Sequence, residues 1–307
     1  MRTTDILVIG GGPAGLTAAI YGARAQLKTL VVERLVLGGQ LATTELVENY
    51  PGFPEPITGP EIIERMEKQA RNWGAEIVYD TIASLRSEGD LRYAVGEAET
   101  YEAKAIVVAT GSTPRKLGIP GENELTARGI CYCATCDGPL FRGKTVAVAG
   151  GGNTACQEGF YLTRFVQKLY LIHRRDQLRA EKVLQERVLR SPKVEPIWNS
   201  VVIRANGRER LQSLTIKNVK TNEESELRLD GLFVFIGTQP NSDFLRGFVE
   251  LNPQGYVIAD ADKRTSVEGV FVAGDVADWK YQQAVSAAGD GCMAAMAARR
   301  YIEGKFA

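Results

Sequence analysis

Five short apolar runs, each leading to a glycine within two residues, dominate the hydrophobic pattern of this chain. Runs of this length bounded by a turn signal are typical of strands buried on both faces of a parallel sheet. The sequence therefore predicts strands at 6–9, 106–109, 146–149, 232–236 and 270–273.

The first and third of these runs open two copies of one unit, offset by 140 residues. An apolar helix follows in each copy, predicted over 14–25 and 154–165, and a second strand comes next, over 28–33 and 168–173. A strand, a helix and a parallel strand form a βαβ unit. The chain is therefore expected to be an α/β protein with two Rossmann-like domains.

Each copy carries a glycine-rich turn between its first strand and its helix, Gly10-x-Gly12-x-x-Gly15 and Gly150-x-Gly152-x-x-Ala155. The first glycine permits the tight turn, and the second lets the backbone approach a pyrophosphate. The third position lets helix and strand pack closely, with the pyrophosphate on free amides at the helix N-terminus. The candidate nucleotide-binding residues are Gly10, Gly12, Pro13, Ala14 and Gly15 in the first copy, and Gly150, Gly152, Asn153, Thr154 and Ala155 in the second.

The end of the second strand differs between the copies. The first ends in Glu33, an acid that can accept hydrogen bonds from ribose hydroxyls. The second has His173, Arg174 and Arg175, with Arg179 shortly after, and guanidinium groups pair bidentately with a 2′-phosphate. The difference predicts FAD at the first site and NADPH at the second. The alternative is that the arginines form a solvated surface cluster.

Two later predicted strands lead to Gly111 and Gly237, and prolines and polar residues follow each of them. Such places are natural crossover points between domains. The second nucleotide domain is therefore expected to be inserted into the first. The expected divisions are 1–113 for the first part of the FAD domain, 114–243 for an NADPH domain that carries the redox pair described below, and 244–307 for the second part of the FAD domain.

The returning segment contains the last predicted strand, which leads into Gly274 and Asp275. Asp275 is placed to bind a polyol such as a ribityl chain, and a helix following Ala288 is expected to present its N-terminus to the same region. Gly-Asp is also a common turn, so the flavin assignment depends on the other signatures.

Composition limits the function classes further. With 307 residues the chain can form two domains. Its 37 basic residues balance 37 acidic ones and no run of lysines and arginines stands out, which argues against nucleic acid as a main partner. No apolar run approaches the ~18 residues of a membrane span, and no secretory signal is evident. A cytoplasmic protein is expected, in which five cysteines indicate redox or metal chemistry rather than a disulfide scaffold.

The most specific chemical feature is Cys133-Ala-Thr-Cys136-Asp137, which lies between the two glycine signatures. Cysteines at this spacing can form a disulfide at a helix start, where local amides lower the thiol pKa. Because disulfide exchange needs a thiolate and a proton for the released thiol, Asp137 is the candidate acid and base.

Other interpretations of this cysteine pair are open. A zinc site needs four ligands, and the only histidine, His173, is already assigned to a nucleotide. A purely structural disulfide would be unusual in the cytoplasm, and inert buried thiols are also possible. Cys156 and Cys292 lie on apolar helices and are expected in the core. Cys131 is a minor candidate for a third redox thiol.

The chain resembles the bacterial-type, low-molecular-weight thioredoxin reductases over essentially its whole length. The stretches that carry the resemblance are 10–15, 38–40, 48–52, 133–138, 150–155, 173–182 and 274–275. The cysteine pair followed by Asp137, together with the histidine-arginine-arginine stretch, is highly specific.

The resemblance implies FAD, NADPH, a homodimer, and thioredoxin as the disulfide substrate. It also implies an NADPH domain that swivels, so that hydride reaches FAD in one orientation and Cys133–Cys136 is reduced in the other. No metal is implied. The FAD contacts that it adds are Gly39, Gln40, Asn49, Thr110, Gly111, Gly274, Asp275, Gln283 and Ala284.

Three positions depart from the family pattern. Gln282 replaces a usual arginine, which puts in doubt one contact near the flavin or nicotinamide. Cys131 stands where a serine is common, and Gln157 replaces a frequent acid.

The sequence therefore predicts an NADPH-dependent thioredoxin reductase. The alternatives are a flavin-dependent reductase or oxidase of another dithiol or disulfide partner, the reductase of a peroxidase system, and a redox sensor without turnover. The arginine stretch argues against an oxidase that needs no NADPH.

Overall fold

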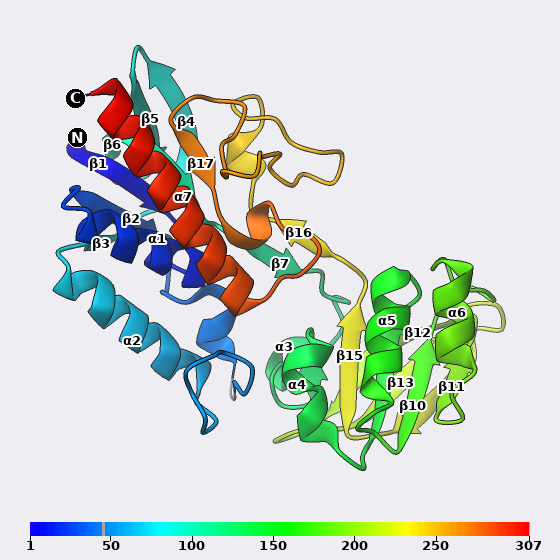
Figure 1. Cartoon of the computed structure of the whole chain (residues 1–307). Helices are drawn as coiled ribbons and strands as arrows, with labels where there is room; N and C mark the ends of the chain where they lie inside the picture. The colour runs from blue at the N-terminus through cyan, green and yellow to red at the C-terminus, as the bar shows by residue number, and fades with distance from the viewer. Residues whose placement is uncertain (45–46, 307) are drawn as a thin grey trace. The chain divides into compact units, whose positions relative to one another are not determined.

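The computed structural model describes residues 1–44 and 47–306. The chain forms two compact units. Unit 1 comprises Met1–Thr113 and Gln239–Ala307, and unit 2 is the continuous segment Pro114–Thr238, coloured from green to yellow in Figure 1. Unit 2 is thus inserted into unit 1. It ends at Thr238, whereas the boundary expected from the sequence was residue 243.

Unit 1 is built on a sheet with a parallel centre. Its order is β3-β2-β1-β6-β5-β4, and β17 pairs with β6. The hairpin β4–β5 is antiparallel, and β5 also runs antiparallel to β6. The strands are β1 (Arg2–Ile9), β2 (Thr29–Glu33), β3 (Glu76–Tyr79), β4 (Ile82–Glu88), β5 (Leu91–Gly96), β6 (Thr100–Val108) and β17 (Val270–Val272).

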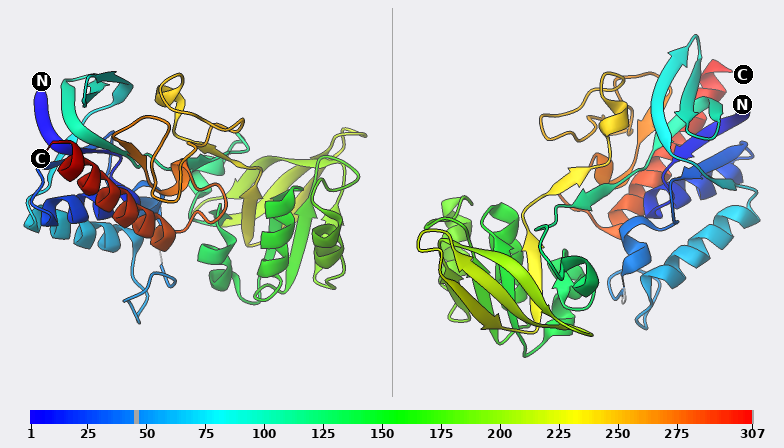
Figure 2. Two further views of the ribbon diagram at one scale, coloured as in Figure 1. Left: turned by 45° about the horizontal axis from the view of Figure 1, so that its top comes forward. Right: turned by 180° about the vertical axis from the view of Figure 1, so that it is seen from behind.

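Both faces of this sheet are covered, which is why its central strands read as continuous apolar runs. One face packs against α1 (Pro13–Arg24) and α7 (Ala284–Lys305), which lie side by side in Figures 1 and 2. The other face packs against η3 (Asp243–Leu245) and the loop that follows it. A Cβ at Gly291 would overlap the carbonyl oxygen of Ala14, so the close approach of the two helices requires glycine there.

A third helix, α2 (Gly59–Asn72), completes unit 1 beside α1. It begins with a capping box, in which Thr58 accepts from the Glu61 amide at 3.3 Å and Glu61 accepts from the Thr58 amide at 3.1 Å.

Unit 2 has an all-parallel sheet of order β11-β10-β9-β15-β8. One face packs against the helices α5 (Asn153–Leu162) and α6 (Lys182–Leu189), and the other against an antiparallel sheet of three strands. The parallel strands are β8 (Ile130–Cys131), β9 (Thr145–Gly150), β10 (Lys168–Ile172), β11 (Val194–Ile197) and β15 (Gly231–Phe235), and the antiparallel strands are β12 (Ser200–Gly207), β13 (Leu211–Asn218) and β14 (Glu224–Arg228).

The chain passes between the units through two short paired strands, β7 (Ser112–Pro114) and β16 (Thr238–Pro240). Asn241 holds the two chain segments of this crossing together by hydrogen bonds on the side of unit 1. Its amide N–H donates to the Gly111 carbonyl at 3.0 Å, and its side-chain amide donates to the Thr110 carbonyl at 2.8 Å.

The predicted α/β class with parallel sheets is confirmed, and the predicted strands and the two βαβ helices agree with the structure to within a few residues, apart from the N-terminal half of β6. The start of the last helix was predicted wrongly. We expected it after Ala288, but α7 begins at Ala284, because Gln283 and Ser286 cap it reciprocally. Glutamine is an uncommon N-cap, so the start of this helix is only weakly marked in the sequence. Within the described residues, no helix could span a membrane.

Candidate active site

The first glycine turn shapes an open cradle at the start of α1. Gly10 has φ +103°, and a Cβ there would lie 2.5 Å from the Ala109 carbonyl oxygen, while a Cβ at Gly15 would overlap the Gly10 carbonyl oxygen. These two glycines therefore fix the turn itself. By contrast, Cβ atoms at Gly12 and Gly39 would meet nothing closer than 4.0 Å. The backbone at those two positions is accessible to a ligand beside the free amides of the first helical turn.

Glu33 closes this cradle at the end of β2. Its carboxylate accepts hydrogen bonds from the amides of Gly11 at 2.7 Å, Arg34 at 2.7 Å and Leu35 at 3.2 Å. The acid is thus held by the backbone in one position. A carboxylate has about four acceptor positions, so it keeps capacity for a hydroxyl group.

A cluster of polar side chains surrounds Asp275, which follows β17 in η4 (Gly274–Val276). The Gln40 amide donates to the Ser112 carbonyl at 3.0 Å and to the Asp275 carboxylate at 3.4 Å. The Gln282 amide donates to the Ser112 hydroxyl at 3.2 Å. Burial, with the Asp278 and Asp290 carboxylates nearby, raises the pKa of Asp275 to about 7.

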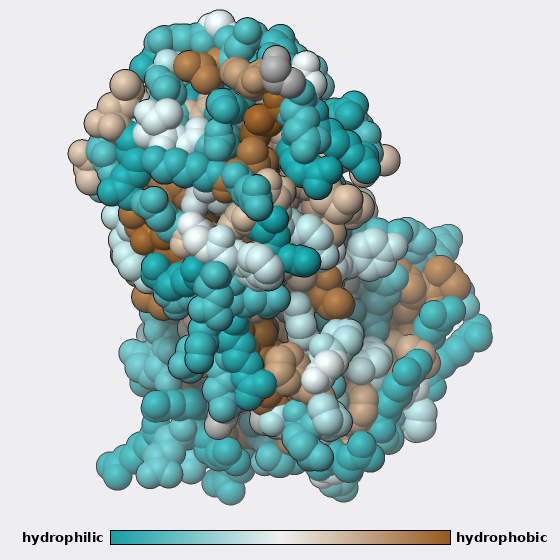
Figure 3. Space-filling view, turned by 60° about the vertical axis from the view of Figure 1, so that its left-hand side comes forward, coloured by the Kyte–Doolittle hydropathy of each residue, from teal (hydrophilic) through white to brown (hydrophobic). Residues whose placement is uncertain are grey.

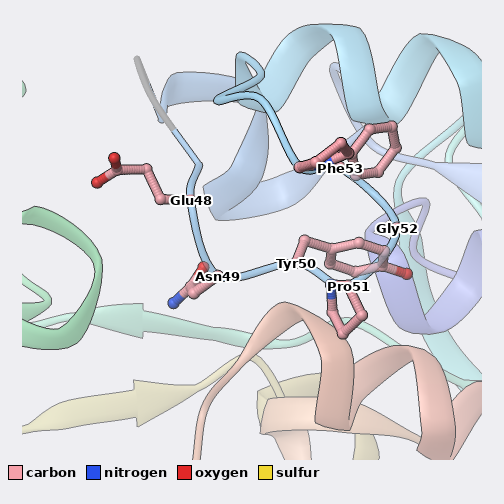
Figure 4. A pocket seen from close by; sticks show the side chains of 7 residues that line it. Glu48, Asn49, Tyr50, Pro51, Gly52 and Phe53 are labelled. Atoms are coloured by element: carbon pink, nitrogen blue, oxygen red, sulfur yellow. The ribbon is translucent and has the colours of Figure 1, made fainter.

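Asn49 reaches the same region from the loop shown in Figure 4. Its side-chain amide donates to the Gln283 side chain, at the start of α7, at 3.4 Å. The loop lines a hollow of about 540 Å³, with Glu48 and Asn49 on one arm and Phe53 on the other. The Tyr50 and Phe53 rings lie 6.1 Å apart, so the loop carries its own small aromatic contact.

The second glycine turn, in unit 2, has a similar design. Gly151 has no room for a side chain, because a Cβ there would overlap the His173 ring, whereas a Cβ at Gly152 would meet nothing within 4 Å. Asn153 begins α5, and its side chain exchanges two hydrogen bonds with Glu181, at 3.1 and 2.9 Å. As in unit 1, one glycine of the turn, Gly151, is packed against the protein, and another, Gly152, is accessible to a ligand.

His173 and the arginines occupy different positions at the end of β10. His173 is buried, and burial together with the neighbouring arginines lowers its pKa, which keeps the imidazole neutral. Arg174, Arg175 and Arg179 are exposed, and within the described residues none of them forms an ion pair with a carboxylate. Three unpaired guanidinium groups therefore lie on this turn.

The cysteine pair lies in unit 2 at the start of a short helix, α4 (Ala134–Asp137). Cys133 and Cys136 form a disulfide with their Cα atoms 5.4 Å apart. The Cys136 amide donates to the Cys133 sulfur at 3.1 Å, so the sulfur of Cys133 takes the N-cap position. An amide N–H at a helix start stabilises negative charge on that sulfur.

The family model described as "Pyridine nucleotide-disulphide oxidoreductase" matches residues 4–291.

The chain belongs to this oxidoreductase family.

Among curated relatives of this oxidoreductase, a thioredoxin reductase of Peptoclostridium acidaminophilum is 45% identical and is covered over 98% of both chains. A thioredoxin reductase of Bacillus subtilis is 43% identical, over 97% of this chain and 95% of the relative. The solved thioredoxin reductase of Streptococcus pyogenes has a TM-score of 0.94 at 39% identity, over 99% of both chains. That of Lactococcus lactis, titled "FR conformation", has a TM-score of 0.69 at 41% identity, over 98% and 99%.

Asp137 of the oxidoreductase is a carboxyl group poised near neutrality. Burial raises its pKa to about 6, and a hydrogen bond from the Cys131 thiol opposes this shift. The Cys131 thiol is itself buried, and its pKa is raised well above its usual range. Cys131 therefore stays a protonated thiol near neutral pH, which disfavours it as a third redox thiol.

Asp137→Asn is expected to stabilise the oxidised protein more at about pH 8 than at about pH 4. The folded-state pKa of about 6 lies above the unfolded value of about 3.9. The folded state therefore loses stability as the pH rises through this window, because a buried carboxyl must ionise. Thermal midpoints of parent and variant at both pH values measure the effect.

Asp176→Asn is the control of opposite sign. Its carboxylate pairs with Lys220 at 3.1 Å, which lowers its pKa, so this variant should lose stability at the higher pH. An Asp137→Asn effect that is equal at both pH values would contradict the assignment.

The structure places the remaining predicted residues as follows. In unit 1, Pro13 is the first residue of α1, Ala14 is buried beneath the turn, and Ala284 is the first residue of α7. In unit 2, Thr154 is exposed in the first turn of α5, and Ala155 is buried behind Gly150. Thr110 and Gly111 belong to the crossing held by Asn241.

Two details correct or extend the sequence prediction. Cys156 is buried as expected, but Cys292 is only half-buried and contacts Met296 at 3.8 Å, so it is not a core residue. Ser112 was not predicted, although its hydroxyl approaches the Asp275 carboxylate at 3.5 Å. Its position after Gly111, at the carboxyl edge of the sheet, is the signal that could have identified it.

Proposed function

We propose that this chain is an NADPH-dependent thioredoxin reductase that acts through bound FAD and the Cys133–Cys136 disulfide. The observation that carries the proposal is this disulfide, with Asp137 beside it, in a chain that has two open glycine turns. Relatives of similar length are named thioredoxin reductase. The net reaction transfers two electrons and a proton from NADPH, with one proton from solvent, to the thioredoxin disulfide.

Unit 1 fits FAD. The open backbone at Gly12 and Gly39 suits the pyrophosphate, and Glu33 retains acceptor capacity for the adenosine ribose. Asp275, with Gln40 and Ser112 around it, is placed to accept hydrogen bonds from a polyol chain. When bound, FAD accepts a hydride from a nicotinamide and delivers the electron pair to a disulfide.

Unit 2 fits NADPH. The open position at Gly152 suits a pyrophosphate, and the three unpaired arginines suit a 2′-phosphate. His173 packs under the glycine turn and is expected to shape it rather than to bind the phosphate as a cation.

In the thiol chemistry, the cysteine pair carries the electrons and Asp137 carries the proton. In the dithiol, the Cys136 amide is placed to stabilise a thiolate at Cys133, because it already donates to that sulfur. Asp137, with a pKa of about 6, can hold a proton on its carboxyl group or accept one from a thiol near neutral pH.

The proposed reaction requires the two units to adopt more than one relative orientation, because nicotinamide and disulfide must each reach the same flavin. Two solved relatives of nearly equal identity to this chain have TM-scores of 0.94 and 0.69, a difference that supports more than one arrangement of the units within this group. The short paired strands β7 and β16 are the connections that would have to bend.

We also propose a homodimer and a cytoplasmic location. The surface in Figure 3 is mostly hydrophilic with separate apolar areas. On α7, three exposed apolar side chains, Val285, Met293 and Met296, share one face of the helix. Such a face, if covered by a second copy, would bury them. A cytoplasmic location suits a chain with unpaired cysteines at three further positions.

The test is anaerobic NADPH oxidation by the flavin-loaded protein, with and without oxidised thioredoxin, repeated with NADH. Oxidation that requires thioredoxin and strongly prefers NADPH is the expected result. Flavin reduction without thioredoxin turnover would favour another dithiol or disulfide partner. No flavin reduction by either nucleotide would refute the proposal.

A further inference from the structure

A shielded ion pair lies next to the Gly274–Asp275 turn. The Lys263 ammonium contacts one Asp290 oxygen at 2.6 Å, and the two side chains are only 21% and 13% exposed. Asp290 belongs to α7, whereas Lys263 lies in the loop before β17. On the same helix, the Arg299–Glu303 pair is 49% and 57% exposed, which is typical of a surface pair that contributes little. The Lys263–Asp290 pair is therefore a different kind of contact.

The second oxygen of Asp290 holds the turn itself. It accepts a buried hydrogen bond from the Gly274 amide at 3.2 Å. Gly274 has φ +76°, and a Cβ there would lie 3.1 Å from Ala14 and 3.4 Å from Ala287, so the turn is wedged between α1 and α7. Asp275 is the next residue, and its direction is set by how this turn is held.

The other end of the pair is fixed to the strand that leads into the turn. Lys263 is a non-glycine residue at φ +65°, a conformation that persists only where the surroundings hold it. Its carbonyl accepts from the Val272 amide in β17 at 3.0 Å, and its amide donates to the Asp260 carbonyl at 3.1 Å. The lysine therefore links β17, just before the turn, to the helix carboxylate that holds the turn.

The pair also balances charge. Asp275 is buried and lies near two further carboxylates, Asp278 and Asp290, and burial together with these charges raises its pKa. Lys263 is the cation that neutralises one of them. Without it, Asp290 would be a shielded, unpaired carboxylate, and breaking such a pair on one side is far more costly than removing both partners.

We propose that Lys263 is a positioning residue for flavin binding, acting through Asp290 on the Gly274–Asp275 turn. This inference rests on the proposed binding of FAD by unit 1. The lysine does not contact the reacting atoms. Its effect is to keep the Asp290 carboxylate in place and the Asp275 carboxylate directed at the polyol chain.

The test compares FAD affinity in four variants of the full chain. After dilution of the holoprotein, free and bound flavin are separated by ultrafiltration and measured by absorbance, which gives the FAD Kd without any turnover assay. Lys263→Met is expected to raise the Kd about tenfold, equivalent to about 1.4 kcal/mol. Lys263→Arg keeps the charge and should stay close to the parent. Arg299→Met, which breaks the exposed pair on the same helix, should leave the Kd unchanged.

The double variant Lys263→Met with Asp290→Asn distinguishes positioning from general damage. Asparagine keeps an acceptor for the Gly274 amide and removes the unpaired charge, so most of the lost affinity should return. Because the double variant leaves no unpaired charge at positions 263 and 290, it also tests the inference if Lys263→Met fails to fold.

Two results would overturn the inference. One is an unchanged Kd in Lys263→Met, and the other is a double variant that binds no better than Lys263→Met. If the parent protein itself binds no FAD, the proposed function fails first, and with it this inference.

Discussion

Cys136→Ser is expected to abolish thioredoxin reduction while leaving NADPH-driven reduction of the flavin intact. Serine oxygen cannot form or exchange a disulfide, so the route from flavin to thioredoxin is interrupted at the cysteine pair. The residues proposed to bind the two nucleotides are untouched. The loss of kcat/KM for thioredoxin should be at least about 10³-fold, as is usual when a residue that takes part in the covalent chemistry is removed.

Two assays measure these steps separately. Steady-state NADPH oxidation with thioredoxin reports the whole route, and anaerobic mixing with NADPH, followed by flavin absorbance, reports the first step alone. Cys292→Ser is the matched control, because this half-buried thiol lies on α7 and contacts Met296 rather than the cysteine pair. Loss of both steps in Cys136→Ser would contradict the proposal that reduction of the flavin by NADPH does not require the cysteine pair.

Arg174→Ala combined with Arg175→Ala is expected to raise the KM for NADPH by about 10²-fold or more, since a hydrogen bond to a charged group contributes about 1.5–3 kcal/mol. The KM for NADH should change little, because NADH has no 2′-phosphate. Both guanidinium groups are exposed and unpaired among the described residues, so the folded protein should tolerate their removal.

The control removes the same charge from the same unit. Arg208→Ala with Arg210→Ala changes two exposed arginines at the β12–β13 turn, and should leave both KM values near those of the parent. Parallel increases for NADPH and NADH in the Arg174 and Arg175 variant would mean that these residues support the fold of the turn rather than recognise the phosphate.

The sequence predicted the secondary structure best where an apolar run and a glycine turn mark the same element. The C-terminal half of β1 and the centre of β9 are apolar on both faces, and the helices α1 and α5 follow these strands directly. The apolar pattern and the glycines of the turns therefore predict the same elements. The antiparallel strands β12–β14 were not predicted. β14 reads Glu-Ser-Glu-Leu-Arg and is mostly exposed, so hydrophobic alternation cannot identify it.

The site was predicted less completely, because local patterns do not report contacts between distant segments. Charged or repeated motifs such as the arginine stretch and the cysteine pair were visible in the sequence. Ser112 was not, since a single serine has no distinguishing pattern until β6 and β17 bring it beside Asp275. The Lys263–Asp290 pair joins a loop to a helix, and neither residue stands out from its neighbours in the chain.

The hydrogen bonds of Asn241 to Thr110 and Gly111 bear on how unit 2 could be removed or replaced. Because Gly111 and Asn241 are hydrogen-bonded to each other on the side of unit 1, the two cut ends left by deleting unit 2 already lie next to each other. A short turn could join them without disturbing the sheet beneath, and chains tolerate insertions best at such places. The crossing is therefore a place at which the inserted unit could be exchanged for another domain while unit 1 keeps its own core.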